Sequence, residues 1–264
     1  MNVIPLSFID LGIASILVLL LAFISWQTRL GLGRRLLISA SRMILQLLLI
    51  GLILRVLFQT INVWLIIGLA CIMMLIAGRE IISRQKRRIK GGHGYFIGVF
   101  SMFLSSFTIS IFTLLVIINV KPWYTPQYFI PLLGILLGNT MTGISLATDR
   151  LTSQLYEKRN VIEQRLYLGE TWQLASEDIR KDCIRTGLIP IINSMAAAGI
   201  VSLPGTMTGQ ILGGSPPLEA VKYQILILLL VACGTGFGVI CSIFLTSRSL
   251  FDERHRLCLE KLEN

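Results

Sequence analysis

The chain has 264 residues, of which 54% are hydrophobic and only 14% are charged. Soluble globular domains carry about 25% charged residues, so this composition excludes that class and indicates an integral membrane protein. The formal net charge of +10 would fit a nucleic-acid partner only if it were clustered on a soluble face, whereas here the basic residues alternate with long apolar runs. We therefore expect a lipid bilayer as the surroundings and no nucleic acid.

Seven apolar runs are long enough to cross a bilayer, because about 30 Å of hydrocarbon at 1.5 Å per helical residue requires about 20 residues. We predict spans at about 8–26, 36–58, 61–78, 95–118, 129–148, 186–204 and 222–246. The expected fold class is all-α. It is a polytopic membrane protein with about seven transmembrane helices in a single domain, residues 1–264.

The positions of Lys and Arg predict the orientation, because short loops rich in these residues stay in the cytoplasm. With seven spans, 20 of the 24 basic residues fall on one side: three after the first span, six after the third, seven after the fifth and four after the seventh. We expect a multi-pass protein of the plasma (inner) membrane. Its N-terminus lies outside, and its C-terminus and the polar segment at about 149–185 lie in the cytoplasm.

The longest polar stretch of the chain, from Glu163 to Pro190, reads EQRLYLGETWQLASEDIRKDCIRTGLIP. We predict two short helices that meet at a corner, the first over 161–168. The corner is at Gly169, which tolerates a positive φ, and the second helix starts at Thr171, whose side-chain oxygen can cap the next turn. Such a segment can lie on the membrane surface as an amphipathic loop or report to a soluble partner.

Motifs for covalent chemistry and for nucleotide binding are absent from the sequence. There is no GxxxxGK[ST] phosphate loop, so the chain is not expected to bind and hydrolyse ATP itself. HExxH, GxSxG and CxxC are absent as well, so an enzyme is not indicated and no metal ligands are assigned.

Polar side chains inside spans are expensive and are therefore candidates for a transport pathway. The candidates are Arg42, Gln46, Asn139, Met141, Thr142, Asn193, Met207 and Thr208. Arg42 either anchors at the headgroups or faces a pathway or another subunit. Gly134, Gly138 and Gly143 in the fifth span favour close helix packing, with a path lining as the alternative. The Gly- and Pro-rich stretch 204–217 either re-enters the membrane or forms a flexible outer loop.

Several motifs resemble those of known transporters. Glu163, LxLG from Leu166 and IRTGLIP from Ile184 resemble the EAA-like cytoplasmic loop of ABC transporter permeases. Over nearly the whole chain, further motifs resemble the FetB-type iron-export permease family, which is related to plant membrane subunits linked to aluminium tolerance. These motifs are SxxRMILQLLLIGLIL from Ser39, LLGNTMTGISL from Leu136, VSLPGTMTGQILGG from Val201 and EAVKYQI from Glu219.

The resemblance implies a permease subunit of an ABC exporter that moves iron or another metal, free or chelated, out of the cytoplasm. It also implies a permease homodimer and a separate cognate ATPase subunit, which binds ATP and Mg and docks on 163–182; this chain itself would bind no cofactor. The coupling residues that it implies are Glu163, Leu166, Gly169, Glu170, Thr171, Trp172 and Ala175. Many relatives have Ala-Thr-Pro after the loop glycine, where this chain has Glu170, Thr171 and Trp172, so it lacks the preset φ of proline.

Two other functions compete with this interpretation. An ATP-independent secondary transporter would normally need a titrating carboxylate or histidine deep in a span, and none is evident in the sequence. A membrane scaffold that binds an ATPase without moving any substrate has the same sequence features as a pump.

Overall fold

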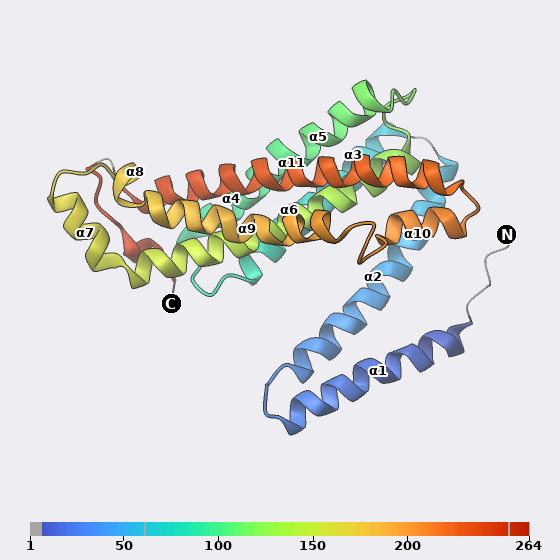
Figure 1. Cartoon of the computed structure of the whole chain (residues 1–264), viewed down its shortest axis with the longest axis horizontal. Coiled ribbons are helices and arrows are strands. Elements are labelled where there is room, and N and C mark those ends of the chain that lie inside the picture. The colour runs from blue at the N-terminus through green and yellow to red at the C-terminus, as the bar shows by residue number, and fades with distance from the viewer. Residues whose placement is uncertain (1–6, 61, 253, 264) are drawn as a thin grey trace. The chain divides into compact units, whose positions relative to one another are not determined.

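A computed structural model describes residues 7–60, 62–252 and 254–263 (Figure 1). Its contacts divide the chain into two compact units, Met1–Asn62 with Gln210–Ser215, and Val63–Gly209 with Pro216–Asn264. The described residues of both units are mainly helical, and their only β-type pairings are three isolated bridges. The expected all-α class is confirmed.

The first unit is mainly a helical hairpin of α1 (Phe8–Gln27) and α2 (Gly33–Gln59). Helix α1 begins with a capping box, in which the Ser7 hydroxyl accepts from the Ile9 amide and the Asp10 carboxylate accepts from the Ser7 amide. Arg29 (φ 54°) and Gly31 (φ 68°) turn the chain between the two helices.

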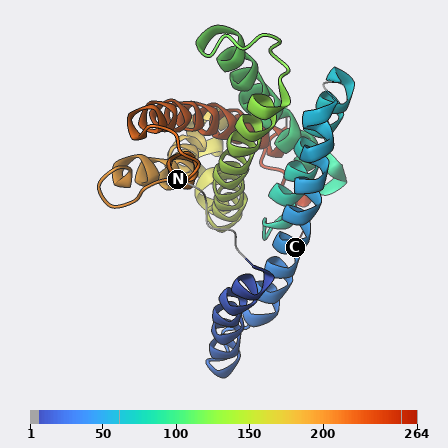
Figure 2. The same ribbon diagram turned by 90° about the vertical axis from the view of Figure 1, so that its right-hand side faces the viewer.

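The second unit is a bundle built from α3, α4–η3, α6, α9 and α11. Helix α6 lies centrally, in contact with α3, α9 and α11 (Figures 1 and 2). The bounds are α3 (Val63–Ser83), η1 (Lys90–Gly92), α4 (His93–Met102), η2 (Phe103–Phe107), α5 (Thr108–Phe112), η3 (Thr113–Ile117), α6 (Pro126–Glu157), α9 (Glu177–Ala197) and α11 (Pro217–Leu250). Shorter helices of this unit are α7 (Arg159–Tyr167), α8 (Trp172–Ala175) and η4 (Leu259–Lys261), and α10 (Gly205–Leu212) begins in this unit and ends in the first.

Many serine and threonine residues are buried where the helices of this bundle pack together. Most that are paired donate to a carbonyl four residues earlier on their own helix, as Ser110 does to Ser106 (2.8 Å), which satisfies the hydroxyl without a partner helix. One pair crosses between helices, because the Ser106 hydroxyl donates to that of Thr140 at 3.2 Å. Small side chains of this kind let helices approach closely in a membrane.

Six helices in the described part of the chain are long and apolar enough to cross a membrane. They are Ile9–Gln27, Gly33–Gln59, Val63–Ser83, Lys90–Ile117, Pro126–Glu157 and Pro217–Leu250, and they coincide with six of the seven predicted spans. Residue 61, the predicted start of the third span, lies outside the described residues. The chain is thus a polytopic all-α membrane protein.

The segment predicted as a span at 186–204 has a different structure. It contains the second half of α9, whose first half is charged from Glu177 to Arg185, so α9 as a whole is not apolar enough for a span of this kind. The helix ends at Ala197, in a turn where the Gly199 amide donates to the Ser202 carbonyl at 2.9 Å. The stretch 204–217 contains the eight-residue helix α10 and a turn at Gly214 (φ 92°).

Candidate functional site

The polar segment between α6 and α9 forms the predicted corner. Helix α7 ends at Tyr167, and Gly169 adopts a φ of 92°, which a residue with a side chain rarely tolerates. The Gly169 amide donates to the Leu166 carbonyl (3.0 Å) and the Glu170 amide to the Arg165 carbonyl (3.2 Å), so the turn closes on the end of α7. The corner at Gly169 is confirmed, and the first helix covers 159–167 instead of 161–168.

Thr171 begins the second helix but does not cap it with its side chain. It occupies the N-cap position with extended backbone (φ −71°, ψ 158°), and no side-chain cap bond is present. Its carbonyl accepts from the amides of Leu174 (3.0 Å) and Ala175 (2.9 Å) instead. The predicted side-chain cap is therefore wrong. Helix α8 is a single turn, and it ends where the Ser176 hydroxyl donates to the Trp172 carbonyl (2.7 Å).

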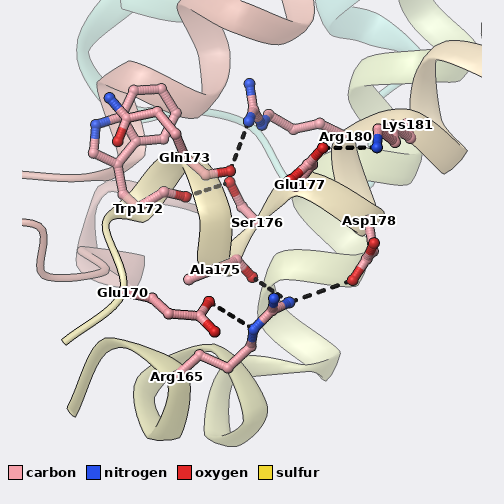
Figure 3. Close-up of polar contacts among 10 residues, drawn as sticks. All are labelled: Arg165, Glu170, Trp172, Gln173, Ala175, Ser176, Glu177, Asp178, Arg180 and Lys181. Atoms are coloured by element: carbon pink, nitrogen blue, oxygen red, sulfur yellow. Dashed lines mark hydrogen bonds and ion pairs between the residues drawn. The ribbon is translucent and has the colours of Figure 1, made fainter. Parts of the chain in front are cut away.

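Arg165 holds the corner together from inside the segment (Figure 3). Its Nε lies 2.8 Å from the Glu170 carboxylate, its Nη1 lies 3.3 Å from the Asp178 carboxylate, and Nη1 also donates to the Ala175 carbonyl at 3.5 Å. One guanidinium therefore joins α7, the corner, α8 and the first turn of α9. Glu170 points back toward Arg165 and is half-buried.

Trp172 points into the protein, since only 3% of it is exposed. Its ring stacks on that of Phe251, with the ring centroids 5.5 Å apart, and its centroid lies 6.1 Å from that of Phe244. Trp172 therefore joins α8 to the end of α11. The Arg180 guanidinium lies over the same ring at 5.4 Å and also donates to the Gln173 carbonyl at 2.7 Å (Figure 3). Ala175 is buried as well.

Large apolar side chains face away from this packed core. Tyr167 is 88% exposed, Leu168 84% and Leu174 52%, although the segment around them is charged. None of the three is among the predicted coupling residues, although Leu168 belongs to the LxLG motif, and apolar positions inside a charged segment were the available signal. Of the remaining predicted coupling residues, Leu166 is half-buried and Glu163 pairs with Arg159 along α7 (2.8 Å).

Helix α9 is fastened to α6 at two levels. The Asp182 carboxylate accepts from the Gln154 amide at 2.8 Å and from Arg150 at 3.3 Å, and these donors lower the pKa of Asp182, the Gln154 hydrogen bond most. Further along, Gly143 and Gly187 meet so closely that a Cβ on Gly187 would lie 2.8 Å from the Gly143 carbonyl oxygen. The two helices are therefore antiparallel neighbours with a fixed register.

The described residues after α11, 251–252 and 254–263, form a C-terminal tail at the same end of the bundle. The Cys258 amide donates to the Leu250 carbonyl (2.8 Å) and the Glu263 amide to the Arg88 carbonyl (2.7 Å), while Leu262 forms a bridge with Ile89. The tail thus connects the end of α11 to the basic loop between α3 and α4.

Two of the pathway candidates are exposed on neighbouring helices. Asn139 lies on α6 and Asn193 on α9, these two helices are in contact, and both residues are exposed. The Asn139 amide donates only to the Ile135 carbonyl of its own helix (2.9 Å), and the half-buried Thr142 donates to Gly138 (3.0 Å).

The other candidates lie elsewhere. Met141 is half-buried on α6, and Met207 and Thr208 are half-buried on α10, where the Thr208 hydroxyl donates to the Pro204 carbonyl (3.2 Å). Arg42 and Gln46 are exposed on α2, in the other unit. Within the residues that the structure describes, no three His, Cys, Asp or Glu side chains gather in a way that could hold a metal ion.

Comparison with known proteins identifies the family to which the chain belongs. The model of a family described as "Uncharacterised protein family (UPF0014)" matches residues 8–251. The UPF0014 membrane protein slr1647 of Synechocystis sp. is 38% identical over 96% of this chain and 97% of its own length. The probable iron export permease protein FetB of Escherichia coli is 29% identical over 96% of each chain. The protein ALUMINUM SENSITIVE 3 of Arabidopsis thaliana is 34% identical over 92% of this chain and 87% of its own length. No solved structure matches. The chain belongs to the UPF0014 family of multi-pass membrane proteins.

Proposed function

We propose that the protein is the permease subunit of an ABC exporter, driven by a separate ATPase subunit that docks on the segment 163–182. The observation that carries the proposal is the exposed apolar surface of Tyr167, Leu168 and Leu174, presented by a corner that Arg165 and Trp172 fix from behind. Large apolar side chains at the tip of a charged segment mark a binding surface.

The alternative for this segment is an amphipathic loop that rests on the membrane. Such a loop needs a continuous apolar face along its helices. In α7 the charged residues Arg159, Glu163 and Arg165 recur through the helix, and the most exposed apolar side chains, Tyr167 and Leu168, lie at its end and in the corner. This arrangement favours a compact partner groove over a lipid surface.

Docking would act mechanically on the membrane helices. A movement of the ATPase subunits would reach α11 through Trp172 and Phe251, and α6 through Asp182 and Gln154. Through these contacts α8 and α9 would move together and would transmit the movement to α11 and α6. The bundle would then rock between inward-open and outward-open states. ATP and Mg would stay on the partner subunit, and this chain would bind no cofactor.

The exposed carboxamides Asn139 and Asn193 support a permease homodimer whose two copies enclose the path. An amide left in lipid lacks partners for its donors and acceptors, and a second copy can supply the same groups in return. Met141, Thr142, Met207 and Thr208 extend the set of weak oxygen and thioether donors available to a passing substrate.

For the substrate, we propose iron or another metal, free or chelated, because the Escherichia coli relative is called a probable iron export permease. Hard cations prefer oxygen ligands, and Asn139, Thr142, Asn193 and Thr208 offer uncharged ones. An anionic complex would instead be favoured by Arg42. If Arg42→Ala leaves the export of free ferrous ion in proteoliposomes unchanged, the anionic-complex version is wrong.

The docking proposal is tested by co-purification with the cognate ATPase. Leu168→Ala combined with Leu174→Ala should weaken association and uncouple ATP turnover from transport. The matched control is Leu218→Ala, a leucine 68% exposed at the far end of α11, which should leave association unchanged.

Deleting Gly169 to Asp178 should abolish coupling altogether. If the deletion variant still binds the ATPase and couples its turnover to transport, the assignment of this segment is wrong. Transport that continues without any ATPase would identify a secondary transporter, and ATPase binding without substrate movement would identify a scaffold.

A further inference from the structure

The α1–α2 hairpin contains a cleft of about 940 Å³ next to its turn. Its walls are apolar and come from both helices, with Leu19 and Phe23 on α1 facing Leu37 and Ile38 on α2. Arg29 and Arg34 line the turn end of the same cleft. The volume is at the upper end of the range of about 300–1,000 Å³ that is typical of ligand sites, and the lining is amphipathic.

The turn end of this hairpin is basic, and the one acidic residue of the hairpin lies far from it. The first 62 residues contain five arginines and one acidic residue, Asp10. Asp10 lies in the first turn of α1, and Arg29 follows 19 positions later, which corresponds to roughly 28 Å along a helix. No carboxylate among residues 7–60 is therefore placed to neutralise Arg29 or Arg34, and the turn end of the cleft favours an anion.

Ser25 provides an independent sign that the cleft receives a ligand. The residue lines the cleft and is only 3% exposed, and its hydroxyl has no hydrogen-bond partner in the part of the chain that the structure describes. A buried hydroxyl without a partner is unfavourable, because it has lost its bonds to water and has gained none. A polar atom of a bound molecule would supply the missing bond.

Backbone geometry holds the cleft in place. Arg29 and Gly31 have positive φ angles in the turn, and a Cβ on Gly33 would lie 3.0 Å from the Ala22 carbonyl oxygen. The helices therefore touch through their main chains beside the cleft. Both are candidate membrane spans, so the turn that joins them lies at a membrane surface, the depth at which lipid headgroups lie.

We propose that this cleft binds an anionic phospholipid. The phosphate would lie between Arg29 and Arg34, an ester or glycerol oxygen would accept from Ser25, and the acyl chains would follow the walls formed by Leu19, Phe23, Leu37 and Ile38. Free phosphate would satisfy only the arginines and would leave these apolar walls without a partner. The inference is independent of the ABC exporter proposal.

The test is native mass spectrometry of the purified full-length protein after exchange into mixed lipid micelles. Phosphatidylglycerol should be retained, one molecule per chain, in preference to phosphatidylcholine with the same acyl chains, and inorganic phosphate alone should not displace it. Arg29→Gln and Arg34→Gln should each weaken retention about fivefold, as expected for one basic residue at a lipid surface. Arg35→Gln, which changes an arginine outside the cleft, should have no effect.

A second pair of variants tests the apolar walls. Leu19→Trp should fill the cleft and exclude the lipid, while Leu20→Trp should not, because Leu20 is equally exposed (54%) but does not line the cleft. Equal retention of both lipids, displacement by inorganic phosphate, or equal effects of Arg34→Gln and Arg35→Gln would overturn the proposal. So would a cross-link between two chains through Leu19→Cys that forms with no lipid bound, since it would assign the cleft to a second copy.

Discussion

At the scale of single residues, the burial of Trp172 shows that its side chain packs inside the protein and is not free to contact a partner. In the sequence Trp172 stands on the proposed docking helix and could equally touch a partner or the protein itself. The structure turns it inward onto Phe251 and Phe244, with Arg180 over its face. The side chains left for a partner are Tyr167, Leu168 and Leu174.

Replacing Trp172 by alanine should loosen α8 without unfolding the bundle. Removing a buried aromatic ring costs about 3 kcal/mol or more, so the amides of Ala175 and Ser176 should exchange with solvent about 100-fold faster. Leu174→Ala is the control, because half of that side chain is already exposed and the exchange should barely change. Equal exchange in both variants would contradict the inward role of Trp172.

Cys183 should be chemically inert in the native protein. It is fully buried on α9, and burial, followed by the neighbouring Asp182 charge, raises the pKa of its thiol to about 12. Because the thiolate is the reactive form, maleimide should not label Cys183 at pH 8 until the protein is denatured. Cys258, half-buried in the tail, is the internal comparison, and equal labelling rates for the two in native protein would refute the burial.

At the scale of elements, the contact between α6, α9 and α11 gives different roles to glycines that look alike in sequence. Gly134, Gly138 and Gly143 were all predicted to favour close packing. A Cβ on Gly143 would lie 2.6 Å from the Thr235 side chain, one on Gly134 would lie 3.4 Å from Met73, and one on Gly138 would meet nothing within 4 Å. Of these three glycines, only Gly143 lies at a close helix–helix contact.

Gly187→Ala should therefore push α6 and α9 apart. Its new methyl group would lie 2.8 Å from a carbonyl oxygen and 2.9 Å from the Ala147 methyl group, and overpacking of this kind costs about 1–3 kcal/mol. Gly138→Ala should be neutral or stabilise α6 by up to about 1 kcal/mol, because alanine is the better helix former. Unfolding in SDS measures both, and a Gly187→Ala variant as stable as the parent would disprove the close contact.

The C-terminal tail should protect the basic loop between α3 and α4. Ending the chain after Asp252 removes the Glu263 bond to Arg88 and the Leu262 bridge to Ile89. Trypsin should then cleave at Arg84 to Arg88 faster than in the full chain, because a freed backbone can enter a protease. Glu260→Ala, a tail variant that keeps both contacts, serves as the control, and unchanged cleavage after truncation would show that the tail does not hold the loop.

At the scale of the whole molecule, the number of crossings decides the orientation of the termini. Six helices of the described residues qualify as spans, and α9, which leads from the segment around Gly169 toward α10, is charged in its first half. The basic residues predict that the α9 region crosses as a seventh span, because only an odd number places the termini on opposite sides.

Reporter fusions at the two ends of the chain test this orientation. A phosphatase fused to the N-terminus should be active outside the cell, and a fluorescent protein fused to the C-terminus should fold in the cytoplasm. Swapping the two reporters is the control. Both termini on one side would mean six crossings and would place the α9 region wholly on one face of the membrane.

The sequence by itself determined the membrane class, six of the seven predicted spans and the corner at Gly169. Each rests on a local property, namely the length of an apolar run or the conformational freedom of one residue. The tertiary structure decided which way side chains face: Trp172 inward, Leu168 outward, Gly143 in a contact and Gly138 outside it. It also removed the predicted Thr171 cap. These outcomes depend on what another helix places beside a residue, and spacing along one chain does not contain that information.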